Sequence, residues 1–281
     1  MIVPLALDLA LSWMHPAAKD DQLVYVAANG HIYVYDATAK EQFPIGEIIP
    51  YNVNAFNLYV DGSKDLYVNG GSTILGYHRG ASEPFTSYED PNMGMISLCG
   101  TGDGTLFAPD GPLRYGAPSD TIEVFQKGHK RPVKTLYEYN ATIQIGNCTA
   151  DANGDVFVAY YGYDGEAIDE FPAGSDYPVT LQTLGNYADY ALALDAQLDL
   201  ILGAEGSLQV IAPPYTGPPI RTFGTTYGSF AFDGSGKHLW STEEGGYAAE
   251  YDYAKGRQIW YTASLSSPGS LYLAVSPQLT P

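Results

Sequence analysis

Basic residues are scarce in this chain of 281 residues. It has 13 Lys and Arg against 32 Asp and Glu, which gives a formal net charge of −19. Nucleic acids and anionic lipid surfaces are both bound through Lys and Arg. The charge therefore argues against both kinds of partner, whereas an acidic surface suits solubility or a cationic ligand.

Long apolar runs are also missing. No stretch of 18 apolar residues occurs, so we expect no membrane span. The apolar start has no basic segment and contains Asp8, which makes it a poor secretory signal. Its pattern suits a strand and a helix equally well and does not decide between them. We predict an N-terminal extension over residues 1–19 and one domain over 20–281.

Charged residues make up only 16% of the chain, while Gly (31), Pro (19) and Tyr (24) are abundant. Gly and Pro mark turns, and Tyr is enriched in strands. This composition is typical of an all-β protein with many turns and aromatic strands.

A four-strand pattern recurs along the chain. Each unit has an apolar strand, a polar turn, a second strand, a loop, a third strand and, in most units, a Pro before the fourth. The turn position recurs at intervals of 38 to 50 residues, a period typical of β-propeller blades. The residues at this position are Asp61, Thr101, Asp151, Asp195, Asp233 and Ser276.

One unit is split between the two ends of the sequence. The last strand-like segment, "LYLAV", has no partners after it, and the N-terminal segments "QLVYVAANGHIYVYDATAK" and "FPIGEII" lack a first strand. Joining them completes a blade and removes an exposed sheet edge. The sequence therefore predicts a six-bladed β-propeller of four-stranded blades, closed by pairing the C-terminal strand with the N-terminal blade.

The repeated sequence pattern "D-x-x-G-[DN]-[LV]-[YF]-V … I-x-x-[YF]-x-x-G" resembles that of NHL/YVTN-type propellers, and the resemblance covers residues 20–281. Segments such as "EFPAGS" and "VIAPPYTGPP" resemble secreted bacterial repeat proteins. The resemblance implies the six-bladed fold, and NHL-like propellers include lyases, hydrolases and binding modules, so it does not select a function.

The resemblance also suggests a test for lactonase-like hydrolases, which hold a divalent ion with Glu, Asn and Asp side chains at the channel. In this sequence a set of Asn57, Asn147 and Asp189 can be assembled only by mixing positions of the repeat. We therefore expect no metal site and no cofactor, with a Ca²⁺ ion in the channel as the minor alternative.

The loops that open on one end of a propeller channel are rich in Tyr and acidic residues in this chain. Tyr has a flat apolar ring and a polar tip, which suits sugar rings and cationic groups, although Tyr also packs in strands. The ligand-binding candidates are Asn57, Arg114, Tyr115, Asn147, Tyr160, Tyr161, Tyr163, Tyr187, Asp189, Tyr190, Glu205, Tyr227 and Glu243.

We interpret the protein as a secreted, periplasmic or cell-surface monomer that binds a carbohydrate, a cationic small molecule or a protein at the channel mouth. The alternative is a lactonase- or lyase-like enzyme that acts at the same face. The two cysteines, Cys99 and Cys148, occur in the first strands of consecutive blades, two and three residues before their turn positions respectively, so they differ in parity. Their side chains can therefore enter one inter-blade space, and we predict a disulfide there, as in oxidising compartments.

Overall fold

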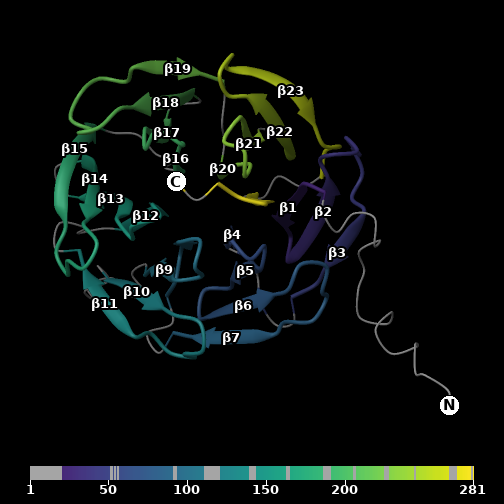
Figure 1. Cartoon of the computed structure of the whole chain (residues 1–281), viewed down its shortest axis with the longest axis horizontal. Helices are drawn as coiled ribbons and strands as arrows, with labels where there is room; N and C mark the ends of the chain where they lie inside the picture. The colour runs from purple at the N-terminus through teal and green to yellow at the C-terminus, as the bar shows by residue number, and fades with distance from the viewer. Residues whose placement is uncertain are drawn as a thin grey trace.

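The computed structural model describes residues 21–50, 53, 55, 57–90, 94–110, 121–138, 144–162, 165–185, 191–204, 207–224, 228–243, 245–265, 271–279 and 281. The predicted extension over residues 1–19 lies outside them. Within the described residues the chain forms six four-stranded antiparallel sheets, arranged in a ring (Figure 1). This confirms the predicted six-bladed β-propeller.

Each sheet contributes one strand to each of four concentric positions. The innermost strands are β4 (Asn57–Val60), β8 (Cys99–Gly100), β12 (Gln144–Ala150), β16 (Leu192–Leu194), β20 (Phe230–Phe232) and β24 (Tyr272–Ser276). The second strands are β1 (Leu23–Ala28), β5 (Leu66–Asn69), β9 (Leu106–Pro109), β13 (Val156–Gly162), β17 (Leu200–Ala204) and β21 (His238–Glu243). The third strands are β2 (His31–Asp36), β6 (Thr73–Tyr77), β10 (Thr121–Phe125), β14 (Gly165–Phe171), β18 (Ser207–Ile211) and β22 (Tyr247–Asp252). The outermost strands are β3 (Gly46–Ile48), β7 (Thr86–Glu89), β11 (Lys134–Tyr137), β15 (Val179–Gly185), β19 (Arg221–Phe223) and β23 (Arg257–Tyr261).

Blade 1 contains strands from both ends of the sequence, in the order β24-β1-β2-β3. Strand β24 pairs antiparallel with β1 from Ala27 opposite Tyr272 to Leu23 opposite Ser276. Blades 2 to 6 follow in chain order, from β4–β7 to β20–β23. The ring is therefore closed by backbone hydrogen bonds, as the split repeat predicts.

The hydrophobic core is divided among the contacts between neighbouring blades. Successive residues of a strand point to opposite faces of its sheet. In β1, accordingly, Leu23 and Tyr25 pack against blade 2, whereas Val24 and Val26 pack against blade 6. The other blade pairs are joined by similar clusters. Strand β1 is thus buried on both faces and reads as a continuous apolar run.

The repeated turn aspartate caps the turn between the first and second strands. The Oδ1 atom of Asp195 accepts hydrogen bonds from the backbone N–H groups of Gln197 and Asp199, both at 2.9 Å. The same pair of bonds forms at Asp61 and Asp151. A carboxylate that accepts two backbone N–H groups stabilises a tight turn. This structural role explains why Asp recurs at the turn position of the repeat.

The following blade often adds a contact to the same carboxylate. The hydroxyl of Tyr253 in blade 6 donates to Oδ2 of Asp195 in blade 5 at 2.8 Å. Nζ of Lys127 in blade 3 donates to Oδ2 of Asp61 in blade 2 at 3.0 Å. Each turn of this kind therefore also links its blade to the next.

The disulfide predicted between blades 3 and 4 is present. Cys99 in β8 and Cys148 in β12 are bonded, with their Cα atoms 5.7 Å apart. Both side chains are buried in the apolar cluster between the two blades, next to Phe107 and Val158. The parity argument from the sequence is confirmed, because the two cysteines enter the same inter-blade space.

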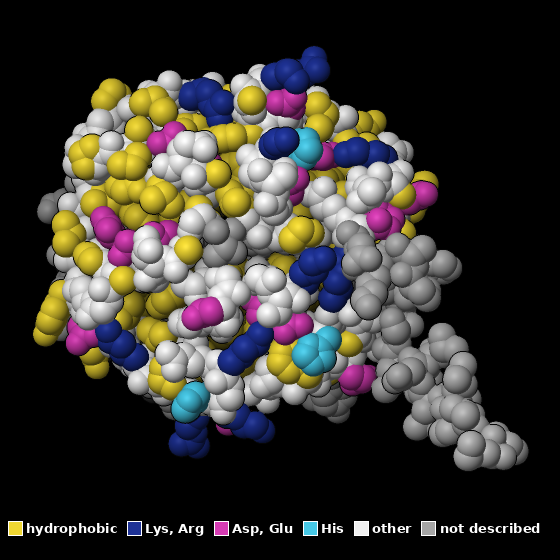
Figure 2. Space-filling view, viewed as in Figure 1, with side chains coloured by type: hydrophobic (Ala, Val, Ile, Leu, Met, Phe, Trp, Pro, Cys, Tyr) yellow, Lys and Arg dark blue, Asp and Glu magenta, His cyan; other side chains and the backbone are white. Residues whose placement is uncertain are grey.

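The outermost strands carry the exposed apolar side chains, among them Phe43 at the edge of blade 1, Ile220 beside β19 and Tyr261 in β23. On the face shown in Figure 2, acidic side chains lie over several separate parts of the surface rather than in one patch. On this face the acidic side chains are thus spread out, which is the arrangement expected of a solvated acidic surface.

Candidate functional site

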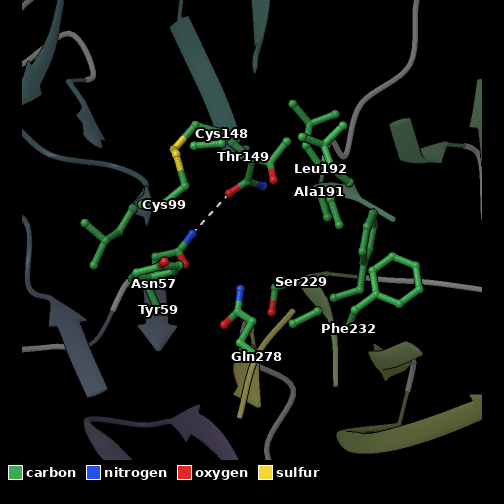
Figure 3. A pocket seen from close by; sticks show the side chains of 18 of the residues that line it. Asn57, Tyr59, Cys99, Cys148, Thr149, Ala191, Leu192, Ser229, Phe232 and Gln278 are labelled. Atoms are coloured by element: carbon green, nitrogen blue, oxygen red, sulfur yellow. Dashed lines mark hydrogen bonds between the residues drawn. A yellow bond between two sulfur atoms is a disulfide. The ribbon is translucent and has the colours of Figure 1, made fainter. Parts of the chain in front are cut away.

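A cavity of about 60 Å³ lies on the axis of the ring, surrounded by the innermost strands of the blades (Figure 3). A cavity of this volume holds roughly five water molecules, so a sugar or a peptide does not fit inside it. The polar side chains in its lining are Asn57, Asn147, Thr149, Ser229 and Gln278. A larger ligand must therefore bind at an end of the channel.

One end of the channel is covered by residues that follow β24. The carbonyl oxygen of Pro277 accepts a hydrogen bond from the N–H of Gly234 at 2.9 Å, and that of Pro281 accepts one from Ala152 at 2.5 Å. Gly234 and Ala152 directly follow turn aspartates, so this is the turn end of the channel. Figure 1 shows the chain reaching the centre of the ring there.

The opposite end, which we call the mouth, is where the innermost strands begin. Three polar side chains from blades 2, 3 and 4 form a hydrogen-bonded network at this level. The Nδ2 atom of Asn57 donates to Oγ of Ser97 and to Oδ1 of Asn147, both at 3.1 Å. The hydroxyl of Ser97 donates to the same Oδ1 of Asn147 at 2.9 Å. Figure 3 shows Asn57 directed into the central space.

The network occupies one position of the repeat, four residues before each turn position. The residues at this position are Asn57, Ser97, Asn147, Ala191, Ser229 and Tyr272. Two of the predicted ligand-binding residues, Asn57 and Asn147, are thus brought together although they are 90 residues apart in sequence. The three side chains of this network are two amides and a hydroxyl, which donate and accept hydrogen bonds without changing charge.

Tyr160, a third predicted ligand-binding residue, lies between blades 3 and 4. Its side chain is 6% exposed and packs in the apolar cluster with Val158 and Leu136. Burial, together with the charges of Asp169 and Glu138, raises the pKa of Tyr160 to about 12. The strand alternation that buries Val158 also buries Tyr160, so this residue contributes to blade packing.

Glu243, at the end of β21, is also buried, with 6% of its surface exposed. Its Oε1 atom accepts a hydrogen bond from the hydroxyl of Tyr251 at 2.9 Å. Burial and the nearby charge of Glu243 raise the pKa of Tyr247. The carboxylate thus has a structural partner within blade 6.

Tyr161 lies in β13 opposite Gln144, and its side chain lies outside the described part of the structure. The remaining candidates also lie outside the described residues. They are Arg114, Tyr115, Tyr163, Tyr187, Asp189, Tyr190, Glu205 and Tyr227. Their assignment to the mouth stays a prediction.

A second polar site, which the sequence interpretation missed, lies between blades 2 and 3. Asp90, Asp110 and Glu123 are all buried, and one carboxylate oxygen from each lies within 4.8 Å of the others. Burial, with the charges of Asp90 and Glu123, raises the pKa of Asp110 to about 8. Three carboxylates at this separation form a donor set suited to a hard divalent cation.

Comparison of the sequence with protein-family models and with curated proteins found no match. In the described part of the chain, no helix has the length and apolar character that crossing a membrane requires. The ring of six four-stranded sheets and the two polar sites are the features of the described residues that bear on function.

Proposed function

We propose that this protein is an exported binding module that holds a neutral carbohydrate at the mouth of its channel. The observation that carries the proposal is the network of Asn57, Ser97 and Asn147. It presents polar groups at one end of a channel whose other end is covered by chain. The ligand binds across the mouth, because the cavity behind it holds only a few waters.

The chemistry of the network favours a ligand rich in hydroxyl groups. Amide and hydroxyl side chains offer both donors and acceptors, and none of them carries a charge that would select an ionic ligand. Aromatic rings beside such groups provide a flat apolar surface for a sugar ring. Tyr161 and Tyr190 are the residues that we expect to supply it.

Export is supported by the Cys99–Cys148 disulfide. Disulfides form and persist in oxidising compartments and are rare in the cytosol. Both cysteines of the chain are used in this bond, which leaves no free thiol. We therefore place the protein in the periplasm, at the cell surface or outside the cell.

The proposal is tested by screening the purified protein on a glycan array and measuring the best ligand by calorimetry. Asn147→Ala is the test variant, and Gln278→Ala, at the covered end, is its control. Loss of one or two hydrogen bonds of about 1 kcal/mol each weakens binding about tenfold. Gln278→Ala is expected to bind as the wild type does.

Two results would contradict the proposal. If no glycan binds, the mouth does not recognise carbohydrate. If the protein instead hydrolyses lactones and Asn147→Ala loses that turnover while Gln278→Ala keeps it, the site belongs to a lactonase-like enzyme. Melting temperatures of both variants control for misfolding.

A further inference from the structure

The buried acidic cluster between blades 2 and 3 is formed by residues that follow two strands and one residue within a third. Asp90 follows β7, Asp110 follows β9, and Glu123 lies in β10. The backbone N–H of Asp110 donates to the carbonyl of Thr121 at 2.9 Å, which sets Asp110 opposite Thr121. Glu123 is two residues further along β10, so both carboxylates share a face of the blade. Asp90 reaches this face from the neighbouring blade.

All three residues are almost fully removed from solvent, with exposed fractions of 4% for Asp90, 4% for Asp110 and 3% for Glu123. Some of their oxygens have neutral donors. Thr121 Oγ1 donates to Oδ2 of Asp110 at 3.3 Å, and Thr135 Oγ1 donates to Oε2 of Glu123 at 2.9 Å.

The Oδ1 atom of Asp110 is the feature that points to a ligand. It is buried, it belongs to a side chain that is 96% removed from solvent, and no donor group reaches it in the structure described, since the Asp90 carboxyl beside it is an acceptor when ionised. A buried acceptor without a donor is rare in folded proteins and calls for a specific explanation. A cation held jointly by Asp110, Asp90 and Glu123 supplies one.

The next interface of the ring provides a natural comparison. Strand β13 pairs with β14 as β9 pairs with β10, which puts Tyr160 in the place of Asp110 and Asp169 in the place of Glu123. There the Tyr160 hydroxyl is hydrogen-bonded to Asp169. A proton donor thus faces the acidic residues between blades 3 and 4, whereas a third carboxylate faces them between blades 2 and 3.

We propose that Asp90, Asp110 and Glu123 bind a Ca²⁺ ion that joins blades 2 and 3. Oxygen-only ligands select hard cations over Zn²⁺ or Cu²⁺. Oxygens bound to one Ca²⁺ lie up to about 5 Å apart, since each Ca–O distance is about 2.3–2.6 Å. The observed limit of 4.8 Å fits this span. The site is structural and goes beyond the proposed binding function, on which it does not depend.

The test uses the full chain after treatment with a chelator, titrated with CaCl₂, MgCl₂ and MnCl₂ by calorimetry. We expect one saturable Ca²⁺ site per chain and a melting temperature that rises with Ca²⁺ concentration, because the ion binds only the folded state. Asp110→Asn is expected to lose at least tenfold in Ca²⁺ affinity and most of the thermal shift. Tyr160→Phe, at the equivalent position of blade 4, should retain both.

If Asp110→Asn does not fold, Glu123→Gln is titrated in its place. No saturable binding up to about 10 mM, ten times the weakest affinity common in extracellular calcium modules, would overturn the proposal. Ca²⁺ binding that survives in Asp110→Asn and Glu123→Gln would place the ion elsewhere, and a preference for Mg²⁺ or Mn²⁺ would refute the assignment to calcium.

Discussion

Breaking the Cys99–Cys148 bond is expected to lower the free energy of unfolding by an amount set by the length of the loop that the bond closes. The two cysteines are 49 residues apart in sequence. In the unfolded chain the bond restricts this loop, and the chain-entropy model assigns such a loop a stabilisation of about 4 kcal/mol. Reduction releases the loop in the unfolded state while both sulfur atoms stay in the structure.

The corresponding change in melting temperature follows from the length of the chain. Globular proteins gain about 2.1 cal/mol/K of unfolding entropy per residue, which is about 0.6 kcal/mol/K for 281 residues. A loss of about 4 kcal/mol therefore lowers the melting temperature by about 7 °C.

The assay is differential scanning calorimetry of the wild type with and without a phosphine reductant. The matched control is the double variant Cys99→Ala, Cys148→Ala, which has no bond to reduce and must be insensitive to the reductant. This variant is expected to melt below the reduced wild type. It also loses two sulfur atoms from the cluster between blades 3 and 4, where the cysteines are 5% and 6% exposed.

A thiol titration in denaturant without reductant provides the independent check, and we expect no free thiol. Two free thiols would refute the bond itself and remove the main support for export. A shift of less than about 2 °C on reduction would refute the entropy argument, because it would mean that the unfolded chain is already restricted between blades 3 and 4.

Two further predictions concern the ring and its turns. Truncation after Leu265 removes β24, whose pairing with β1 closes blade 1. We expect the lost stabilisation to exceed the whole free energy of unfolding of a typical domain, ~5–15 kcal/mol. A soluble truncated protein with a cooperative melting transition would contradict this. Asp195→Ala removes the acceptor for two backbone N–H groups and the Tyr253 hydroxyl; we expect a loss of about 2–4 kcal/mol in urea unfolding. Asp195→Asn keeps an acceptor oxygen and should lose less, so equal losses would argue against the capping role.

The fold could be predicted from the sequence because similar local chemistry recurs from blade to blade, most clearly in blades 2, 4 and 5. A turn residue such as Asp61 or Asp195 caps its turn with two backbone hydrogen bonds, and this requirement keeps it at a fixed place in the repeat. The spacing of these positions predicts six blades, one of which is shared between the two ends of the sequence. The closing pair of β24 and β1 confirms that interpretation.

The site was harder to predict because a position in the repeat does not fix the surroundings of a side chain. Tyr160 lies near the mouth end of β13, yet it shares a face with Val158 and is buried. Asp110 likewise shares a face with Ala108, which packs between blades 2 and 3. Strict attention to strand alternation would have found both residues. A carboxylate on an apolar face is the signal that was missed.

Tyrosine content misled in a similar way. Tyr25, Tyr67 and Tyr88 are among the largest fully buried side chains, with burial that raises the pKa of Tyr25 to about 12. A tyrosine ring has enough apolar surface to fill an inter-blade core, and its hydroxyl can hydrogen-bond within that core, as that of Tyr67 does with Asp61. The abundance of Tyr therefore reflects blade packing as well as any ligand site, and composition alone does not separate the two.

The polar network at the mouth spans the same two interfaces that carry the additional links described above. The bond between Asn57 and Ser97 crosses from blade 2 to blade 3, where the acidic cluster lies. The bond between Ser97 and Asn147 crosses from blade 3 to blade 4, where the disulfide lies. Side chains that bind a ligand must be held within a fraction of an ångström by their supporting elements. A cation at one interface and a covalent bond at the other would fix blades 2, 3 and 4 against each other, which is the support that a preorganised site at the mouth requires.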